Sequence, residues 1–549
     1  MSYSDASPRK IELLSGSLDD PRLEQSIERK RRFTESSERR SFDDMEPTHL
    51  FEHFMILGIP PDFDLTKPLE PRILFLFPAA PLLFSEDDFN QTADFCFPNG
   101  IEPHGLTYKR KNIFISEFVF RLDSKSIYGV CVHFIANPAR VPFFATDDTI
   151  KYPFCFCILT KDPILSVHFQ YLTYMTLLYC RVLNPEGERD IQYNEVQDGP
   201  TLSYLEEEKG TARWPGTRYP DVLHTELEYF MGMKRADNRD LKYVLSEDLR
   251  LVIPPIKTEI VSIALPTLDV LFSCLSVANI TKLFEALLLE HHTIFKSKDL
   301  HLLTLSVLAA RALLSPFKIG ASLLPIVPNT PRHLPILEAP FPYIYGITST
   351  SSMPSISLPQ NMCVVDLDKG TIDDPMLDVE LPGQAQFIRT IENALKQDKQ
   401  YILAPPPYIK QKDKKVPNKD FLEFLDRVHF YMRPPRYLKF IKPKYVFIPP
   451  LVDSLLNTFS HHIANKLEGR ISPCFVTDST DCEHPVTIFN KDLFLASVPK
   501  DEEAFYQEFT GTQIFTQFCE GKTDKMDETK RMFSTLGSAS DPNSSPIIQ

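Results

Sequence analysis

Apolar residues in the first part of the chain recur with a period of two, which is typical of strands. In residues 118–134, FVFRLDSKSIYGVCVHF, two alternating apolar runs flank the polar stretch 123–126 and predict an antiparallel hairpin. Cys131 then points away from Val130 and Val132, and we expect a cysteine in the middle of a strand to pack rather than to react. The apolar spacing becomes helical in 168–183. Residues 49–180 are therefore predicted to form a small α/β lobe.

Strands and helices alternate between 257 and 397. The run IVSIAL (260–265) is predicted to be a strand, 268–290 a helix, 293–297 a strand, and 300–314 a helix that is apolar nearly all round. The apolar runs 323–328, 341–347 and 362–368 follow as further strands. This alternation predicts a mostly parallel sheet flanked by helices.

The remaining segments have other patterns. Residues 181–256 mix charged and turn residues without a sustained period and are predicted to be a linker. A helical module is predicted over 398–520, with one helix in 450–469 that Gly469 should end and another in 501–521. The ends, 1–48 and 521–549, are rich in polar residues and are predicted to be disordered tails.

Length and charge restrict the class of protein. The 549 residues suggest about three or four domains. A net charge of −14 and a pI near 5.5 argue against a nucleic-acid partner, which would favour a basic domain. No apolar run reaches the ~20 residues that span a bilayer, and the N-terminus lacks the apolar core of a signal peptide. We expect a soluble, cytoplasmic protein that reaches membranes only through partners or weak surface charge.

Ten cysteines without a C-x-x-C pair indicate a reducing compartment. Cys155 and Cys157 share one face of a strand, but the nearest histidines, His133 and His168, belong to other segments. A zinc site needs a second pair with suitable spacing, so the sequence predicts no metal and no cofactor.

Motifs that would indicate catalysis are incomplete. Gly521-Lys522-Thr523 could end a phosphate-binding loop, but Thr516 stands where such a loop needs glycine. The doublets 291–292 and 461–462 place two histidine rings about 100° apart on a helix, so neither doublet offers two ligands to one metal. We expect these histidines to be solvated or at helix ends, and we predict no catalytic residue.

Asp366 and Asp368 end a predicted parallel strand, at the edge where open α/β sheets usually bind ligands. The simpler interpretation is that these carboxylates start a loop and cap the turn that follows.

Residues 268–317, LDVLFSCLSVANITKLFEALLLEHHTIFKSKDLHLLTLSVLAARALLSPF, followed by LLPIVP, LEAPFPYIYGI and VVDLD, resemble the central part of a DENN domain in order, spacing and residue type. Upstream, HFMILGIPPDF, PRILFLFP, FCFPNGI, FVFRLDSKSIYGVCVHF and YPFCFCILT are similar to the small N-terminal DENN module. FLASVPKDEEAFYQEFTGTQIFTQFCEG is similar to the end of the downstream module.

The resemblance implies a fold and a function. The fold is α/β, with an upstream longin-like lobe at 49–180, a linker at 181–256, a central α/β module at 257–397 with a mostly parallel sheet, and a downstream helical module at 398–520. The function is guanine nucleotide exchange on a Rab-family GTPase in vesicle trafficking, with no chemical step of the chain's own and with trafficking adaptors as further partners. In the family, both lobes contribute to the groove that holds the GTPase. The contact candidates are polar positions of the central motif: Asn279, Glu290 and Ser297.

One departure concerns the choice of GTPase. Family members commonly carry P-F-x-W-x-H before the apolar strand, whereas here Ile319 replaces the tryptophan and Ala321 the histidine. Two other functions stay open. The chain could be a DENN-type adaptor that binds a GTPase or coat protein without exchange, or an unrelated α/β enzyme with a dispersed active site. A deep polar pocket at the strand ends near Asp366 and Asp368 would favour the enzyme.

The N-terminal tail carries two candidate phosphorylation sites. Two arginines precede Thr34 in RRFT, and two precede Ser41 in RRS, an arrangement that basophilic kinases bind with acidic pockets. A phosphate adds about −1.5 to −2 charges and would weaken attraction between this basic cluster and an acidic surface.

Overall fold

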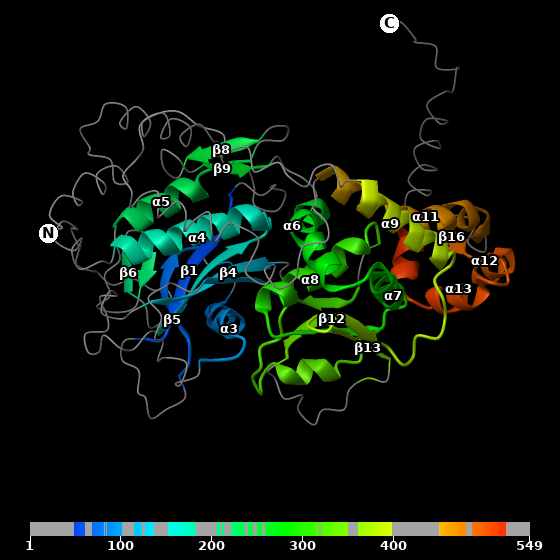
Figure 1. Cartoon of the computed structure of the whole chain (residues 1–549), viewed down its shortest axis with the longest axis horizontal. Coiled ribbons are helices and arrows are strands. Elements are labelled where there is room, and N and C mark those ends of the chain that lie inside the picture. The colour runs from blue at the N-terminus through cyan, green and yellow to red at the C-terminus, as the bar shows by residue number, and fades with distance from the viewer. Residues whose placement is uncertain are drawn as a thin grey trace, which may run out of the picture.

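The computed structural model describes residues 49–60, 69–81, 83, 85–101, 115–122, 127–136, 152–182, 206–208, 211–213, 221–235, 240–244, 250–254, 259–317, 320–349, 359, 361–397, 449–478 and 486–522. Two lobes lie side by side (Figure 1). Each lobe is built around its own sheet, which confirms the predicted α/β class.

The first lobe holds a seven-stranded antiparallel sheet in the order β3-β4-β5-β1-β2-β7-β6. Its strands are β1 (His53–Gly58), β2 (Arg72–Phe77), β3 (Ile115–Leu122), β4 (Ile127–Ala136), β5 (Tyr152–Thr160), β6 (Glu206–Glu208) and β7 (Thr211–Arg213). The hairpin predicted in 118–134 is confirmed as β3 and β4, with Phe118 opposite Cys131.

Helices α3 (Glu86–Cys96) and α4 (Leu165–Val182) cover opposite faces of this sheet (Figure 1). The Ser85 hydroxyl accepts a hydrogen bond from the Asp88 amide and so caps α3. Adjacent residues of β3 point to the two faces, and Glu117 accordingly bonds Thr173 of α4. The predicted α4 is confirmed.

The segment predicted to be a linker contains short elements that complete the first lobe. They are β6, β7, α5 (Asp221–Met231), β8 (Leu241–Val244) and β9 (Arg250–Ile253). The ring of Phe230 in α5 stacks on Tyr171 of α4 with centroids 3.7 Å apart. Strands of three or four residues are too short to give a readable period.

The second lobe holds a five-stranded sheet in the order β11-β12-β10-β13-β14. All neighbours are parallel except β13 and β14, which confirms the mostly parallel sheet. The strands are β10 (His292–Ser297), β11 (Ser322–Leu324), β12 (Tyr343–Thr348), β13 (Met362–Asp366) and β14 (Thr371–Asp373). Helix α8 (Leu300–Leu313) follows β10, as predicted.

The strand predicted at 260–265 is wrong. These residues belong to α6 (Glu259–Cys274), which contains Pro266 and is followed by α7 (Val277–Leu288) after a bend of 118°. The single helix predicted over 268–290 is therefore two helices in the structure, and Ser276 caps the second one, α7. A short apolar run rich in β-branched residues fits a buried helix as well as a buried strand, and packing against α8 selects the helix.

The C-terminal helices pack against the second lobe (Figure 1). They are α9 (Gln384–Gln397), α11 (Pro449–Ile471), α12 (Lys491–Ser497), α13 (Glu503–Phe509) and a helix at 513–522, with the hairpin of β15 (Phe475–Asp478) and β16 (Val486–Phe489) between α11 and α12. Gly469 does not end α11, because Leu467 and Ile471 are buried on the same face and the helix continues to Ile471. The run 501–521 is divided by a turn at 510–512.

Within the described helices, none is alone long and apolar enough to cross a membrane, while the bent pair of α6 and α7 meets the length and composition criteria only when taken together.

Candidate functional site

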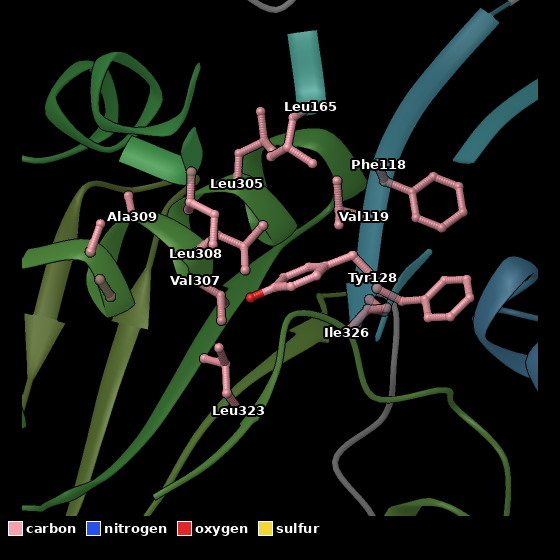
Figure 2. Packing of buried hydrophobic residues seen from close by; sticks show 14 of the residues in the cluster. Phe118, Val119, Tyr128, Leu165, Leu305, Val307, Leu308, Ala309, Leu323 and Ile326 are labelled. Atoms are coloured by element: carbon pink, nitrogen blue, oxygen red, sulfur yellow. The ribbon is translucent and has the colours of Figure 1, made fainter. Parts of the chain in front are cut away.

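The two lobes meet where α8 packs between the second sheet and strand β3 of the first. Val119 of β3 faces Leu305 and Leu308 of α8, and the Tyr128 ring points toward Val307 (Figure 2). These side chains are buried. The apolar cores of the two lobes are therefore one continuous cluster.

A hydrogen bond from a backbone amide to a side-chain hydroxyl crosses this junction. The amide of Val119 donates to Thr304 Oγ1 over 3.1 Å, and the Thr304 hydroxyl donates to the Leu300 carbonyl over 2.8 Å. Thr304 is fully buried, so one hydroxyl satisfies a β3 amide that would otherwise lie in the core without a partner.

Glu117 and His301 form a second polar contact across the junction. His301 Nδ1 donates to the Glu117 carbonyl over 3.1 Å, and Thr173 Oγ1 donates to the Glu117 carboxyl over 3.2 Å. Burial raises the pKa of Glu117 to about 7 and, against the charge of Asp299, lowers the pKa of His301 to about 4. His301 is thus neutral at physiological pH, and it joins the lobes by a hydrogen bond.

The end of α3 supplies a third set of contacts. His333 Nε2 lies 3.0 Å from a carboxylate oxygen of Asp94, and Thr348 Oγ1 donates to Asn99 Oδ1 over 2.7 Å. The Asn329 amide donates to the Pro98 carbonyl over 2.7 Å. Because Thr348 ends β12, the junction reaches the C-terminal edge of the second sheet.

The carboxylates at this edge are held by neighbouring groups. Asp366 accepts hydrogen bonds from the Lys369 amide (3.0 Å) and ammonium (2.7 Å), which lower its pKa although partial burial acts to raise it. Asp368 accepts from the hydroxyl of Ser297 over 2.8 Å and from the amide of Lys298 over 3.1 Å. Both aspartates therefore act as caps of loops, the simpler of the two predicted roles.

The three predicted contact residues lie in different parts of the second lobe. Asn279 Nδ2 donates to the Gly370 carbonyl over 2.8 Å, so it ties α7 to the turn after β13. Ser297 ends β10 at the edge of the sheet. The Glu290 carboxylate accepts the amides of Gln513 and Ile514 over 2.8 and 2.9 Å and caps the helix 513–522. Contact of these residues with a GTPase stays a prediction.

Other predicted positions lie outside the described residues, namely Thr34, Ser41 and Ile319. Ala321, which stands in place of the family's histidine, is partly exposed just before β11.

The histidine doublets differ from the expectation of solvated side chains. His291 is buried, with Nδ1 2.8 Å from an Asp374 carboxylate oxygen, and His292 is buried beside Asn361. His462 stacks on Phe387 with centroids 4.0 Å apart, and only His461 is exposed. These partners cannot be identified from the sequence pattern, because they come from distant segments.

An open cleft of about 740 Å³ lies between α9 and α11 and is lined by Phe387, Asp453, His461, His462 and Lys466 among others. Burial, together with the charge of Lys466, lowers the pKa of His462 to about 4. Asp453 is the one carboxylate among the lining residues, so the cleft offers no pair of acids for general acid and base catalysis.

Cys155 and Cys157 share one face of β5 and Cys131 is buried within β4, as predicted, and the fold adds Cys96 of α3 to this face. Cys96, Cys131 and Cys157 have their sulfur atoms within 4.8 Å of one another. Helix α3 brings Cys96 and strand β4 brings Cys131 beside the cysteines of β5.

Comparison with known proteins agrees with this architecture. The family described as "DENN (AEX-3) domain" matches residues 235–370, which include α6 to β13 of the second lobe. The family described as "dDENN domain" matches residues 489–535, which include α12, α13 and the helix 513–522 that Glu290 caps.

Curated relatives match about two fifths of the chain. This chain is 35% identical over 224 residues to "Elicitor of plant defense protein 1" of Gibberella zeae. It is also 35% identical over 222 residues to the protein of that name from Fusarium odoratissimum, and each match covers 39% of this chain. It is 27% identical over 234 residues, 40% of this chain, to the "MAP kinase-activating death domain protein" of Mus musculus. The matches span 18%, 23% and 15% of these relatives, less than a quarter of their length. The chain thus carries a DENN domain at 235–370 and a dDENN domain at 489–535.

Proposed function

We propose that the chain is a guanine nucleotide exchange factor that promotes GDP release from a Rab-family GTPase in membrane trafficking. The observation that carries this proposal is the junction, where a shared core and hydrogen bonds fix the first lobe against the DENN domain. Such a pair of lobes presents one preformed surface made of both.

A preformed surface suits exchange for a physical reason. An exchange factor works by binding the nucleotide-free GTPase more tightly than the loaded one, so it must hold the partner's switch segments in a displaced arrangement. A rigid surface does this well, because little binding free energy is lost in ordering the factor itself.

The predicted contact residues have a defined role in this proposal. Asn279, Glu290 and Ser297 each bond another segment of the lobe through the side chain. We infer that they shape the GTPase-binding surface, while exposed neighbours such as Lys298 supply charge at the edge of the sheet.

A fluorescent-GDP release assay over a panel of Rab GTPases tests the proposal. We expect the full chain to accelerate release from at least one member, and Lys298→Glu to reduce the rate about tenfold with unchanged melting temperature. Lys491→Glu, an exposed substitution on α12, is the matched control. Binding without accelerated release from any member would favour an adaptor role for the chain.

Regulation by the N-terminal tail belongs to the same proposal. In this proposal the basic cluster before Thr34 and Ser41 folds back over the GTPase groove of this acidic protein and inhibits exchange until added negative charge releases it. The double variant Thr34→Asp/Ser41→Asp and the deletion of 1–48 should therefore both raise the exchange rate. Unchanged rates at low and moderate salt would contradict this regulation.

A further inference from the structure

Four cysteines converge on one face of the first sheet. Cys131 of β4 lies opposite Cys157 of β5, and Cys155 lies two residues away on the same face, opposite His133. Cys96, the last residue of α3, reaches them from the helix that covers this face. All four side chains are fully buried. Four of the ten cysteines thus come together from three separate elements.

The sulfur positions fit a soft metal ion. The sulfur atoms of Cys96 and Cys131 are 3.8 Å apart, and Cys157 completes a set whose members all lie within 4.8 Å. Zinc bound to sulfur at about 2.3 Å in a tetrahedron places neighbouring sulfurs about 3.8 Å apart. Cys155 lies outside this set of three but on the same face of β5, two residues from Cys157, and is the candidate for a fourth ligand.

The surroundings hold these ligands in place. His133 Nε2 donates to the Cys96 carbonyl, and its ring stacks on Phe97 with centroids 4.8 Å apart. The last turn of α3 is therefore fixed on the sheet beside the thiols. Ligands carried by strands and a helix, with a second layer of hydrogen bonds, favour a structural site.

We propose that Cys96, Cys131, Cys155 and Cys157 bind one zinc ion that fastens α3 to the first sheet. Binding by four thiolates would release four protons and give the site a net charge of −2; if Cys155 stays a thiol, three protons leave and the charge is −1. The same end of α3 carries Asp94, Pro98 and Asn99, which contact the second lobe. The ion would thereby also order the lobe junction.

The test measures metal in the full chain, expressed without a histidine tag in zinc-supplemented medium and purified without chelators. Inductively coupled plasma mass spectrometry should find about one zinc ion per chain. The X-ray absorption spectrum of zinc should show that its first coordination shell contains sulfur alone, at about 2.3 Å. Cys131→Ser should lose the zinc, and Cys363→Ser, a buried cysteine of the second sheet, should keep it.

Three results would overturn the proposal. They are less than about one tenth of a zinc per chain in folded protein, a shell containing nitrogen or oxygen, and a disulfide between these cysteines found after alkylation of the native chain. The absorption spectrum and the alkylation use the unaltered chain, so they decide the question even if Cys131→Ser does not fold.

Discussion

Single side chains in this protein connect segments that are far apart in the sequence. Glu290 is the clearest case, because it has a φ of +57°, a left-handed conformation that is unfavourable for a residue with a side chain. Its carboxylate caps a helix 223 residues further along the chain. The hydrogen bonds of that cap offset the backbone strain, which explains why a glutamate rather than a glycine stands there.

We expect Glu290→Ala to lower the free energy of unfolding by about 1 to 2 kcal/mol, because two helix amides lose their acceptor while the strained backbone remains. Chemical denaturation measures this change, and proteolysis should then cut near 513–522 sooner. Glu508→Ala, an exposed substitution in α13, is the control and should change little. Equal stability of the two variants would contradict the role of the cap.

Glu117 should make stability depend on pH. Its folded-state pKa of about 7 exceeds the ordinary value of 4.5, so its contribution is fully present below the ordinary value and is lost as the pH rises through about 7. Glu117→Gln removes this ionisation but can still accept the hydrogen bond from Thr173. Relative to the wild type, the variant should gain about 1 kcal/mol in free energy of unfolding between about pH 6 and about pH 8.5. A constant difference over this range would contradict the raised pKa.

At the level of elements, α8 joins the two sheets. It begins at the edge of the second sheet with Asp299 as its cap, whose carboxylate accepts the amides of His301 and Leu302. It is apolar nearly all round because it is buried on both sides, by its own sheet and by β3. The all-round pattern in the sequence is explained by this position between the lobes.

Thr304→Val should lower the free energy of unfolding by about 1 to 3 kcal/mol, because the shape is kept while the buried Val119 amide loses its acceptor. Thr390→Val is a matched control, since the Thr390 hydroxyl also bonds the carbonyl four residues earlier in a helix, but in an exposed position. Denaturation curves compare the two variants. An equal effect of both substitutions would show that the bond between the lobes contributes nothing.

The whole molecule should unfold as one unit. The buried apolar residues of both lobes form a single cluster, and at least three groups of polar contacts cross the same junction. A domain pair with so continuous a core differs from one joined by a flexible linker, in which the domains move and unfold separately.

Calorimetry of the full chain should therefore show one cooperative transition for the described lobes. Leu308→Ala, a truncation at the junction, should move that whole transition to lower temperature, with a cost of about 2 to 5 kcal/mol. Two resolved transitions, with only one shifted by Leu308→Ala, would mean that the lobes are energetically independent.

The sequence by itself determined which local elements most of the chain forms. Alternation over 118–134 gave the hairpin, and helical spacing gave α4 and α8, because these patterns reflect the face that each element buries. Residue types and spacing in 268–317 also carried the resemblance to DENN domains. At 260–265 the same reasoning failed, because a short run that is apolar on all sides has no period to distinguish helix from strand.

Only the tertiary structure decided which side chains meet. The convergence of four cysteines, the cap that Glu290 gives to a distant helix, and the bond from Val119 to Thr304 all join elements that are remote in sequence. Periodicity reports on the face that a residue shares with its near neighbours. It contains no information on the partner element packed against that face, which depends on how the lobes and helices fold onto one another.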